Sequence, residues 1–217
     1  MTGLSHLDFQ VDTDMTKHWA PNSYCLSRIC SFLALSLVVF FPRGTHASEA
    51  LWSALEEGGK VVLMRHAPVK VGADAGSPLV RDPSCRRERN LSLQGKRQAR
   101  EIGRKFAQHR VPVSQVLHSP FCRTTETAQL AFGEADPAGY LSLLEVLEPE
   151  EAERQTLELS KVIGSYSGRE NLVLVTHEPN ISAVSFELLR HLDLLILEPT
   201  GGSEFEEMGV IRFSDEN

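Results

Sequence analysis

Hydrophobic residues in this chain occur in short runs separated by polar segments, the pattern of a protein in which strands and helices alternate. Four runs have the length and composition of strands: residues 60–64, 113–117, 172–175 and 208–213. The first run and the third are apolar almost throughout, which is typical of strands buried on both faces of a sheet. The last run closes the chain, and we expect it at an edge of the sheet.

Helical spacing of apolar residues predicts helices between these strands. Short helices are expected at 51–57 and after residue 122, and longer ones at 150–165 and 179–192. Ser92 is expected to cap another helix, whose apolar face is Leu93, Ala99, Ile102 and Phe106. Residues 67–90 form a long loop without periodicity, and such loops are usually functional or disordered. The alternation implies an α/β fold: a three-layer α/β/α sandwich with a mostly parallel central sheet.

The amino-terminal part of the chain has a different pattern. Residues 29–41 carry no charge, Lys17 and Arg28 precede them, and Thr45 and Ala47 are small residues at the spacing of a processing site. These are the three regions of a secretory signal peptide. We therefore expect a signal peptide and upstream extension at 1–47, with translation starting at Met1 or Met15, and one domain at 48–217. A retained anchor is the alternative, although the run is shorter than the roughly 20 residues of a membrane span.

The signal peptide predicts a periplasmic or secreted protein that contacts a membrane only through this segment, if it stays uncleaved. The net charge of −7 argues against nucleic acid as a partner. Residues 81–110 are nevertheless basic, and the arginines of the loop, Arg86, Arg87 and Arg89, are suited to attracting an anionic substrate. Cys85 and Cys122 remain in the processed chain, where they are either a disulfide, as export favours, or two free thiols.

Four residues that can bind or attack a phosphoryl group lie where predicted strands end. Arg65 and His66 follow the first strand, Arg123 follows the exit of the second, and His177 follows the third. The carboxyl ends of parallel strands meet at one edge of a sheet, where α/β proteins build their sites. Two guanidinium groups can bind phosphoryl oxygens in a bidentate manner. A neutral imidazole can then act as the nucleophile, while the second histidine donates a hydrogen bond to the phosphoryl group.

Four segments resemble, in order and spacing, the motifs of the histidine phosphatase superfamily, which includes the phosphoglycerate mutases. They are Arg-His-Ala at 65–67, Leu-Ser-x-x-Gly at 91–95, Ser-x-x-x-Arg-x-x-x-Thr-Ala at 119–128 and Val-Thr-His at 175–177. The resemblance covers residues 61 to about 213. It implies a phosphoglycerate mutase-like fold, phosphorylation of His66 and a pocket of Arg65, Arg123 and His177. It implies no metal and no cofactor.

The general acid is less clear than the nucleophile. Well-known members of the family protonate the leaving oxygen with a Glu or Asp on a loop after the second Arg segment. Glu145 and Glu148 are the candidates here, and neither lies in a clear motif. Small phosphohistidine phosphatases of the superfamily have no such acid, so three possibilities stay open. Asn180 is a further polar candidate for the pocket, with helix capping as the alternative.

Export and the two cysteines resemble a bacterial envelope subgroup that includes proteins assigned to phosphate removal from lipopolysaccharide core heptose. The partner implied is a small phosphorylated substrate or a phosphorylated envelope glycan. No large insertion separates Arg123 from His177, so an open cleft is expected. Export disfavours a glycolytic mutase, whose substrates are cytosolic.

The leading hypothesis is an exported, metal-independent phosphomonoesterase with a phosphohistidine intermediate on His66. The alternatives are an envelope protein that binds phosphate without turnover and a phosphohistidine-protein phosphatase. A metal site of His66, His177 and a cysteine is disfavoured, because the chain has no closely spaced ligand pair.

Overall fold

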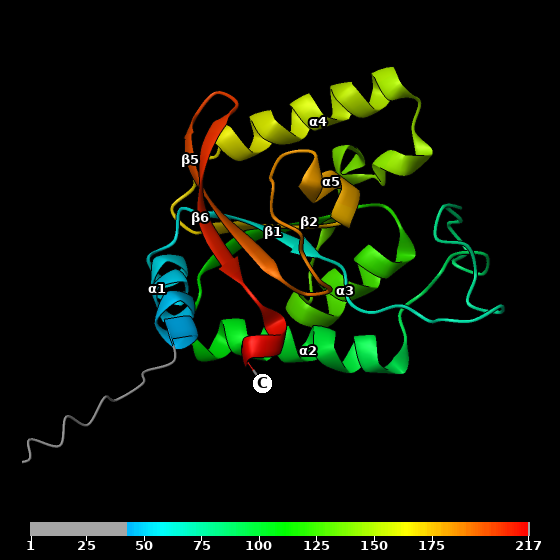
Figure 1. The fold of residues 1–217 in the computed structure, drawn as a ribbon, viewed down its shortest axis with the longest axis horizontal. Helices are drawn as coiled ribbons and strands as arrows, with labels where there is room; N and C mark the ends of the chain where they lie inside the picture. Colours follow the sequence, from blue (N-terminus) through cyan, green and yellow to red (C-terminus); the bar gives the residue numbers. More distant parts are fainter. Residues whose placement is uncertain (1–42, 217) are drawn as a thin grey trace, which may run out of the picture. The chain divides into compact units, whose positions relative to one another are not determined.

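The computed structural model describes residues 43–216, and a six-stranded sheet in the order β3-β2-β4-β1-β5-β6 forms its centre (Figure 1). Strands β1 to β4 are parallel to one another, whereas β5 pairs antiparallel with β1 and β6 antiparallel with β5. The predicted mostly parallel sheet is confirmed. The strands are β1 Val61–Arg65, β2 Val113–His118, β3 Asp136–Pro137, β4 Asn171–Thr176, β5 Leu194–Gly201 and β6 Glu204–Ile211.

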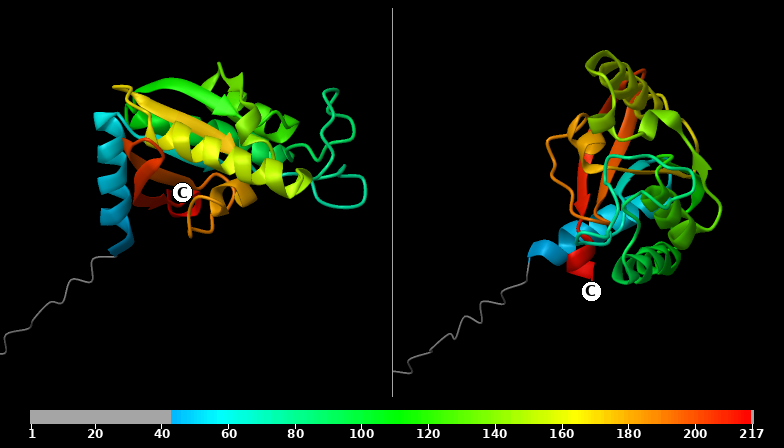
Figure 2. Two further views of the ribbon diagram at one scale, coloured as in Figure 1. Left: turned by 90° about the horizontal axis from the view of Figure 1, so that it is seen from above. Right: turned by 90° about the vertical axis from the view of Figure 1, so that its right-hand side faces the viewer.

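Helices cover both faces of the sheet (Figures 1 and 2). Val62 and Met64 of β1 belong to a core with α1, α2 and α3, whereas Val61 and Leu63 belong to a second core with α4 and α5. The side chains of a strand point alternately to its two faces, so an all-apolar strand fills two cores. The three-layer sandwich is therefore confirmed. The helices are α1 Arg43–Glu57, α2 Leu93–Gln108, α3 Cys122–Phe132, α4 Pro149–Gly164 and α5 Glu178–Ser182, with 3-10 turns η1 Gly139–Leu141, η2 Leu144–Val146 and η3 Phe213–Glu216.

Helix α2 begins where the sequence predicts. The Ser92 hydroxyl accepts a hydrogen bond from the Gly95 N–H at 2.9 Å, which satisfies a free donor of the first turn. Any side chain at Gly95 would collide with the Pro68 carbonyl, so this glycine lets α2 pack closely on the chain that leaves β1. Leu93 is an exception to the predicted apolar face: it is exposed, while Ala99, Ile102 and Phe106 are buried.

The helix predicted over 179–192 is wrong. Helix α5 ends at Ser182, residues 183–193 are mostly irregular, and β5, which the sequence analysis missed, follows. The Ser185 hydroxyl accepts from the Glu187 N–H at 3.0 Å, and the Asp193 carboxylate accepts from the Arg190 N–H at 2.9 Å. Such local side-chain bonds give the backbone an alternative to the helix. The apolar residues of this segment are therefore packed from a loop instead.

The predicted signal segment at 29–41 and the two candidate starts lie outside the described residues. Helix α1 begins at Arg43, earlier than the predicted 51, so residues 45–47 fall within it. Within 43–216, no helix combines the length and apolar character that crossing a membrane requires. The closing strand is at an edge of the sheet, as predicted, although it begins at Glu204 instead of Met208.

Candidate active site

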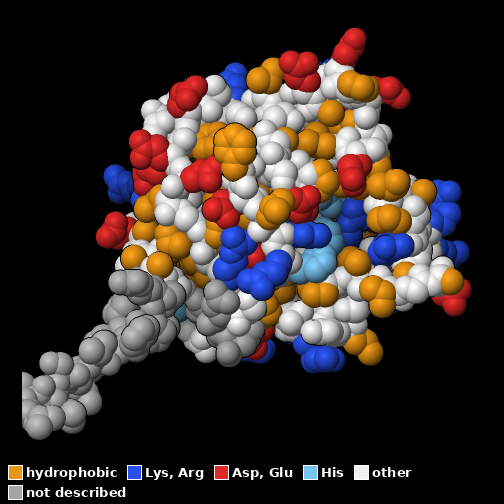
Figure 3. Space-filling model, in the orientation of Figure 1, with side chains coloured by type: hydrophobic (Ala, Val, Ile, Leu, Met, Phe, Trp, Pro, Cys, Tyr) orange, Lys and Arg blue, Asp and Glu red, His pale blue; other side chains and the backbone are white. Residues whose placement is uncertain are grey.

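A cleft of about 340 Å³ opens at the carboxyl ends of β1, β2 and β4. It brings together Arg65, His66, Arg123 and His177, the four residues that the sequence analysis singled out. In the space-filling view, histidine side chains are visible in a hollow bordered by Lys and Arg side chains (Figure 3). The charged and imidazole-bearing residues that line the cleft are Arg65, His66, Arg89, Arg123, Glu145, His177, Glu178 and His191.

His66 is held in a defined orientation and protonation state. Its N–H donates to the Thr176 carbonyl at 3.0 Å, which ties the end of β1 to the end of β4. Its ring Nδ1 lies 2.9 Å from the Ala67 carbonyl oxygen, and a carbonyl only accepts, so Nδ1 carries the hydrogen and Nε2 the free lone pair. Burial, followed by the charges of Arg123 and Arg65, keeps the pKa of His66 well below the usual histidine value. Nε2 thus carries a free lone pair at neutral pH, as a nucleophile requires.

Arg123, in the first turn of α3, is a buried cation with a free hydrogen-bond donor. Its Nη2 donates to His177 Nδ1 at 3.2 Å, and its guanidinium lies 4.5 Å from the centre of the Phe121 ring. Its Nη1 is buried without a protein partner. Burial is also the main reason that the pKa of Arg123 falls to about 10. A buried N–H group that lies beside a cleft and has no protein partner is well placed to donate a hydrogen bond to an anionic oxygen.

Arg65 is arranged in the same way on the other side of the cleft. Its Nη1 donates to the Leu189 carbonyl at 2.6 Å, while its Nε is buried without a protein partner. Burial lowers the pKa of Arg65, and the nearby carboxylates of Glu178 and Asp193 partly oppose this. The two guanidinium groups therefore hold unused donors in one cleft. An anion with several oxygens, such as a phosphoryl group, would satisfy them.

His177 has both ring nitrogens occupied. Nδ1 accepts from Arg123, and Nε2 lies 2.8 Å from the Ser119 hydroxyl oxygen. Burial and the charges of Arg123, His66 and Arg65 hold its pKa well below the usual value, so the ring is neutral. Because Arg123 can only donate, the ring hydrogen lies on Nε2 and faces Ser119. The expected hydrogen bond from His177 to a phosphoryl group is therefore not available in this tautomer.

Thr127 connects the chain directly after His66 to α3, the helix that carries Arg123. Its hydroxyl accepts from the Ala67 N–H at 3.0 Å and donates to the Arg123 carbonyl at 2.6 Å. The Thr-Ala pair of the third motif thus fixes the turn after His66 against α3.

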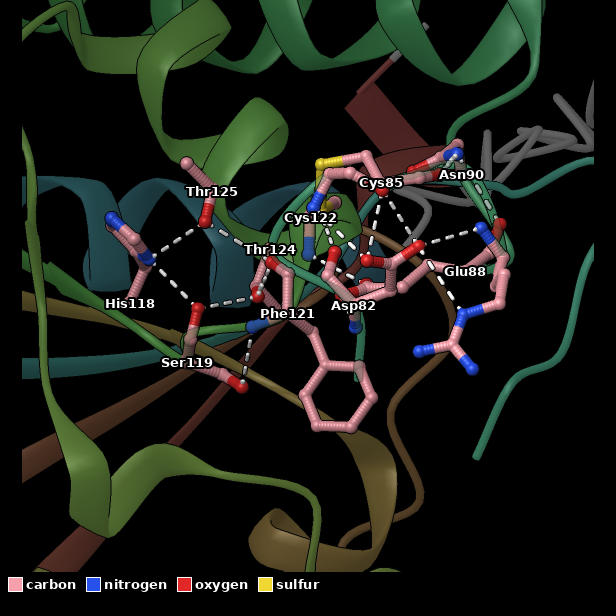
Figure 4. Close-up of a disulfide and its surroundings, with 12 residues drawn as sticks. Asp82, Cys85, Glu88, Asn90, His118, Ser119, Phe121, Cys122, Thr124 and Thr125 are labelled. Carbon is pink, nitrogen blue, oxygen red and sulfur yellow. Dashed lines mark hydrogen bonds and ion pairs between the residues drawn. A yellow bond between two sulfur atoms is a disulfide. The ribbon is translucent and has the colours of Figure 1, made fainter. Parts of the chain in front are cut away.

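The long loop at 67–90 is attached to the start of α3 by a disulfide between Cys85 and Cys122, whose Cα atoms are 5.8 Å apart (Figure 4). The carboxylate of Glu88, 2% exposed, adds a second attachment. Its two oxygens accept from the Asp82 N–H and the Cys122 N–H, both at 2.8 Å. Of the three loop arginines proposed for anion attraction, Arg89 lines the cleft, whereas Arg86 and Arg87 do not.

The structure separates the two acid candidates and gives Asn180 another role. Glu145, in η2, lines the cleft, whereas Glu148 lies just before α4 and outside it. Asn180 is fully buried: its amide nitrogen donates to the Ser142 carbonyl at 2.7 Å, and its oxygen accepts from the Leu144 N–H at 3.3 Å. Asn180 neither lines the cleft nor caps α5. Instead it holds the loop that carries Glu145.

The sequence model of the histidine phosphatase superfamily, branch 1, matches residues 61–145, from β1 to Glu145. The match shows that this segment is similar to the histidine phosphatase superfamily over about two fifths of the chain. The match includes Arg65, His66 and Arg123 and ends before His177. No curated protein matches the chain in sequence.

Solved structures share the fold of residues 61–145 and the strands around them. The protein histidine phosphatase SixA, complexed with tungstate, has 14% identity and a TM-score of 0.54, with 73% of this chain and 99% of that chain covered. YhfR of Bacillus stearothermophilus has 15% identity and a TM-score of 0.51, with 68% and 94% covered. A candidate alpha-ribazole-5'-P phosphatase of Escherichia coli K-12 has 13% identity and a TM-score of 0.51, with 69% and 94% covered. At these identities the similarity concerns the fold.

The sequence analysis missed His191, which also lines the cleft. Its Nδ1 donates to the His66 carbonyl at 2.9 Å, and its ring centre is 5.1 Å from that of His66. The signal was the apolar run at 194–197, three residues after it. Because β5 runs antiparallel to β1, the start of β5 lies at the same edge of the sheet as the end of β1. Recognising this strand would have placed His191 beside His66.

The metal-site reading finds no support in the structure. Both cysteines of the domain are in the disulfide, so neither is a free thiolate ligand. Among residues 43–216, no group of three or more His, Cys, Asp or Glu side chains is placed to hold a metal ion.

Proposed function

We propose that the protein is an exported phosphatase that hydrolyses phosphomonoesters through a phosphohistidine intermediate on His66. The observation that carries this proposal is the pairing of an unprotonated His66 Nε2 with two guanidinium groups, the half-buried Arg65 and the buried Arg123, each of which holds a buried, unused donor atom. Phosphoryl transfer depends mainly on positioning and on stabilising charge on the phosphoryl oxygens. This cleft supplies both.

The reaction we propose has two steps. In the first, Nε2 of His66 attacks phosphorus, the bond from phosphorus to the ester oxygen breaks, and Glu145 supplies the proton to that oxygen. In the second, water attacks phosphorus and the bond to His66 breaks, which releases inorganic phosphate. Arg65 and Arg123 hold the phosphoryl oxygens in both steps.

A small phosphorylated molecule or a phosphorylated envelope glycan, such as lipopolysaccharide core heptose, is the substrate class we favour. Between Arg123 and His177 the chain forms the rest of α3, then β3, η1, η2, α4 and β4, and no separate cap. A cleft without a cap can accept either kind of substrate. The apolar segment at 29–41 supports export to the periplasm or medium, and the disulfide is compatible with an oxidising compartment.

The test is a panel of phosphoesters assayed with the full chain and with His66→Ala. The wild-type protein should release phosphate. When it is denatured rapidly and without acid during turnover of a radiolabelled substrate, it should carry a label that is stable in base and labile in acid. His66→Ala should do neither. His109→Ala is the matched control, because this histidine stacks on Trp52 between α1 and α2 and does not line the cleft. Full activity in His66→Ala would refute the mechanism.

A phosphohistidine-protein phosphatase is the second candidate. It is favoured by the fold shared with the protein histidine phosphatase SixA and by the exposed position of Glu145, since a nitrogen leaving group needs little proton donation. A phosphohistidine-bearing protein in the panel separates the two. Preference for it over every ester would favour this candidate, and phosphate binding with no turnover of any substrate would indicate a binding protein.

A further inference from the structure

His191 places a third imidazole in the cleft, beside the proposed nucleophile. It lies in the loop before β5, it lines the cleft, and its ring centre is 5.1 Å from that of His66. Its Nδ1 donates to the His66 carbonyl oxygen at 2.9 Å, and a carbonyl oxygen only accepts. Nδ1 therefore keeps its hydrogen in the neutral and in the charged ring, and Nε2 is the nitrogen that gains or loses a proton.

The Nε2 atom of His191 is free to meet a ligand. Among residues 43–216 it has no hydrogen-bond partner. His191 is also the least enclosed of the three imidazoles: it is partly exposed, whereas His66 and His177 are 7% and 1% exposed. Burial disfavours the charged form of a side chain. A proton therefore costs less on His191 than on the other two.

Nearby charges act in the same direction. Burial lowers the pKa of His191 below the usual value of 6.5 and Arg65 adds to this, while the bond made by Nδ1 and the Asp193 carboxylate oppose it. The other two imidazoles instead lie against Arg123, whose charge lowers the pKa of both. The free cleft thus holds three neutral imidazoles at neutral pH, and His191 is the easiest to protonate.

The position of His191 decides which atoms of a phosphoryl group it meets. The attacking and leaving atoms lie on opposite sides of phosphorus, with three equatorial oxygens between them. His191 stands beside the attacking ring of His66, so it faces an equatorial oxygen, and the role of proton donor to the leaving oxygen stays with Glu145. A neutral Nε2 would direct a lone pair at that anionic oxygen, which is unfavourable.

We propose that His191 takes up one proton when a dianionic phosphoryl group binds, donates from Nε2 to an equatorial oxygen, and by its charge keeps His66 unprotonated. This inference rests on the proposed function of the same cleft. The proton comes from solvent: an N–H bond forms on Nε2, and the ring changes from neutral to a charge of +1. When phosphate leaves, this N–H bond breaks and the proton returns to solvent.

The effect on the nucleophile follows from charge. A bound dianion raises the pKa of every imidazole around it, which works against the free lone pair of His66. A positive His191 opposes this, because its charge lowers the pKa of His66. The proton is thus held on the imidazole that does not react. The other titratable or charged groups around His191 are Arg65, Arg89, Arg123, Glu145, His177 and Glu178 in the cleft, and Asp193, which accepts from Arg212 at 3.0 Å and lies 3.7 Å from Arg190.

Calorimetry of sulfate binding tests the proton uptake. Sulfate has the shape of a phosphoryl dianion and stays a dianion near neutral pH, so any proton taken up belongs to the protein. Titrations of the wild-type protein at pH 7, in buffers of different ionisation enthalpy, should give about half a proton or more per sulfate bound. Sulfate binding without proton uptake, or no sulfate binding, overturns the inference.

His191→Asn isolates the charge. The asparagine amide can still donate to the His66 carbonyl but cannot gain a proton. Most of the proton uptake should be lost, and sulfate should bind about 10-fold more weakly at pH 7, the value of a charge-assisted hydrogen bond. At pH 9 the two proteins should bind sulfate alike. His109→Asn is the matched control, because its ring stacks on Trp52 outside the cleft. Wild-type proton uptake in His191→Asn refutes the inference.

Nitrogen-15 NMR of the histidine rings of the wild-type protein identifies the protonated ring and needs no variant to fold. In the sulfate complex at pH 7, His191 should have both nitrogens protonated, while His66 keeps an unprotonated Nε2. A complex in which the proton lies on His66 or His177 contradicts the proposal.

The pH dependence of turnover is a third readout, which a purely structural role of His191 would not change. Above pH 7 a phosphomonoester is a dianion. For an aryl phosphate, kcat of the wild-type protein should therefore fall as the pH rises through the pKa of His191 in the complex. His191→Asn should have a kcat about 10-fold lower at pH 7 and lack this fall, and identical pH profiles refute the inference. If sulfate binds with proton uptake on His191 but no phosphoester is turned over, the proposed function fails and the inference stands. Turnover through His66 without proton uptake has the opposite meaning.

Discussion

The cleft has two walls that are built differently. The sheet wall consists of Arg65, His66, Arg123 and His177, which sit at strand ends and in the first turn of α3; the last three are less than a tenth exposed. The loop wall consists of residues 67–91 and 142–148, about half of which are exposed, and it reaches the cleft through Arg89 and Glu145. Backbone bonds to the sheet hold the first wall. A disulfide and the side chains of Glu88 and Asn180 hold the second.

This difference separates two tasks. Groups that must meet phosphorus in a fixed geometry are carried by rigid elements, whereas groups that face the rest of a substrate are carried by loops, which vary more easily. The walls meet at the start of α3, where Cys122 holds the loop and the next residue, Arg123, belongs to the sheet wall. Changes in the sheet wall should therefore remove chemistry, and changes in the loop wall should alter substrate choice.

Replacing Arg123 should give the largest effect. Arg123→Ala is expected to lower kcat/KM for an aryl phosphate by about 10³–10⁵, the range seen for arginines that stabilise a transferred phosphoryl group. Arg123→Lys should recover little, because a lysine lacks the planar fork and the stacking on Phe121. Steady-state kinetics measure both. Arg100→Ala, on the exposed surface of α2, is the control. Near-normal turnover in Arg123→Lys would mean that only a positive charge is needed.

Glu145→Gln should give a loss that depends on the leaving group. For an alkyl phosphate we expect kcat to fall by about 10²–10⁴, the usual contribution of a general acid, and for an aryl phosphate or a phosphohistidine much less. Kinetics on a series of esters with different leaving-group pKa values measure the trend. Glu148→Gln, which lies outside the cleft, should behave as wild type. An equal loss on all substrates would show that Glu145 orders the loop wall and does not donate a proton.

The sheet wall could be predicted from the sequence because its signals are local. An apolar run followed directly by Arg65 and His66, and another followed by His177, place these side chains at one edge of a parallel sheet. The pattern also predicted the cap at Ser92 and the three layers. Each of these features depends on residues within a few positions of one another or on the general rules of α/β folds.

The remainder of the site depends on paths that the sequence does not encode locally. Glu145 and Glu148 are three residues apart in one mostly apolar stretch, and only the turn of η2 decides which one reaches the cleft. His191 enters through a loop whose hydrogen bonds replace a predicted helix. The tautomer of His177 depends on Arg123, which comes from a different part of the chain. The resemblance to a family identified the groups but not these contacts.

Removing the disulfide should separate the walls energetically. The double variant Cys85→Ser, Cys122→Ser is expected to lower the free energy of unfolding by up to about 4 kcal/mol, the chain-entropy value for a loop of this size. It should raise KM several-fold while kcat changes little, because Glu88 still accepts from the Cys122 backbone and the sheet wall is held independently. Denaturant unfolding and kinetics measure the two quantities. A fall in kcat as large as the rise in KM would show that the loop also positions Arg123.

Acid should affect the two walls in different pH ranges, with the smallest effect of the four. His66 and His177 are buried and neutral, with pKa values below the usual 6.5, so the unfolded chain binds protons first as the pH falls. The free energy of unfolding is therefore unaffected by these histidines above pH 6.5. Below that pH it declines by at most about 1.4 kcal/mol per pH unit for each histidine.

Asp82 of the loop wall responds later. Hydrogen bonds from the Ser84 side chain and from the Arg87 and Ser84 backbone lower its pKa from 3.8 to about 2. Its contribution is therefore present above pH 3.8 and is lost as the pH falls from there toward 2.

Urea unfolding from pH 7.5 to 5 should show a decline in the free energy of unfolding. His66→Asn should make this decline shallower, and Asp82→Asn should leave its slope unchanged. A wild-type stability that stays flat to pH 5 would mean that the sheet wall does not hold its histidines neutral, and the proposed nucleophile would lose its physical basis.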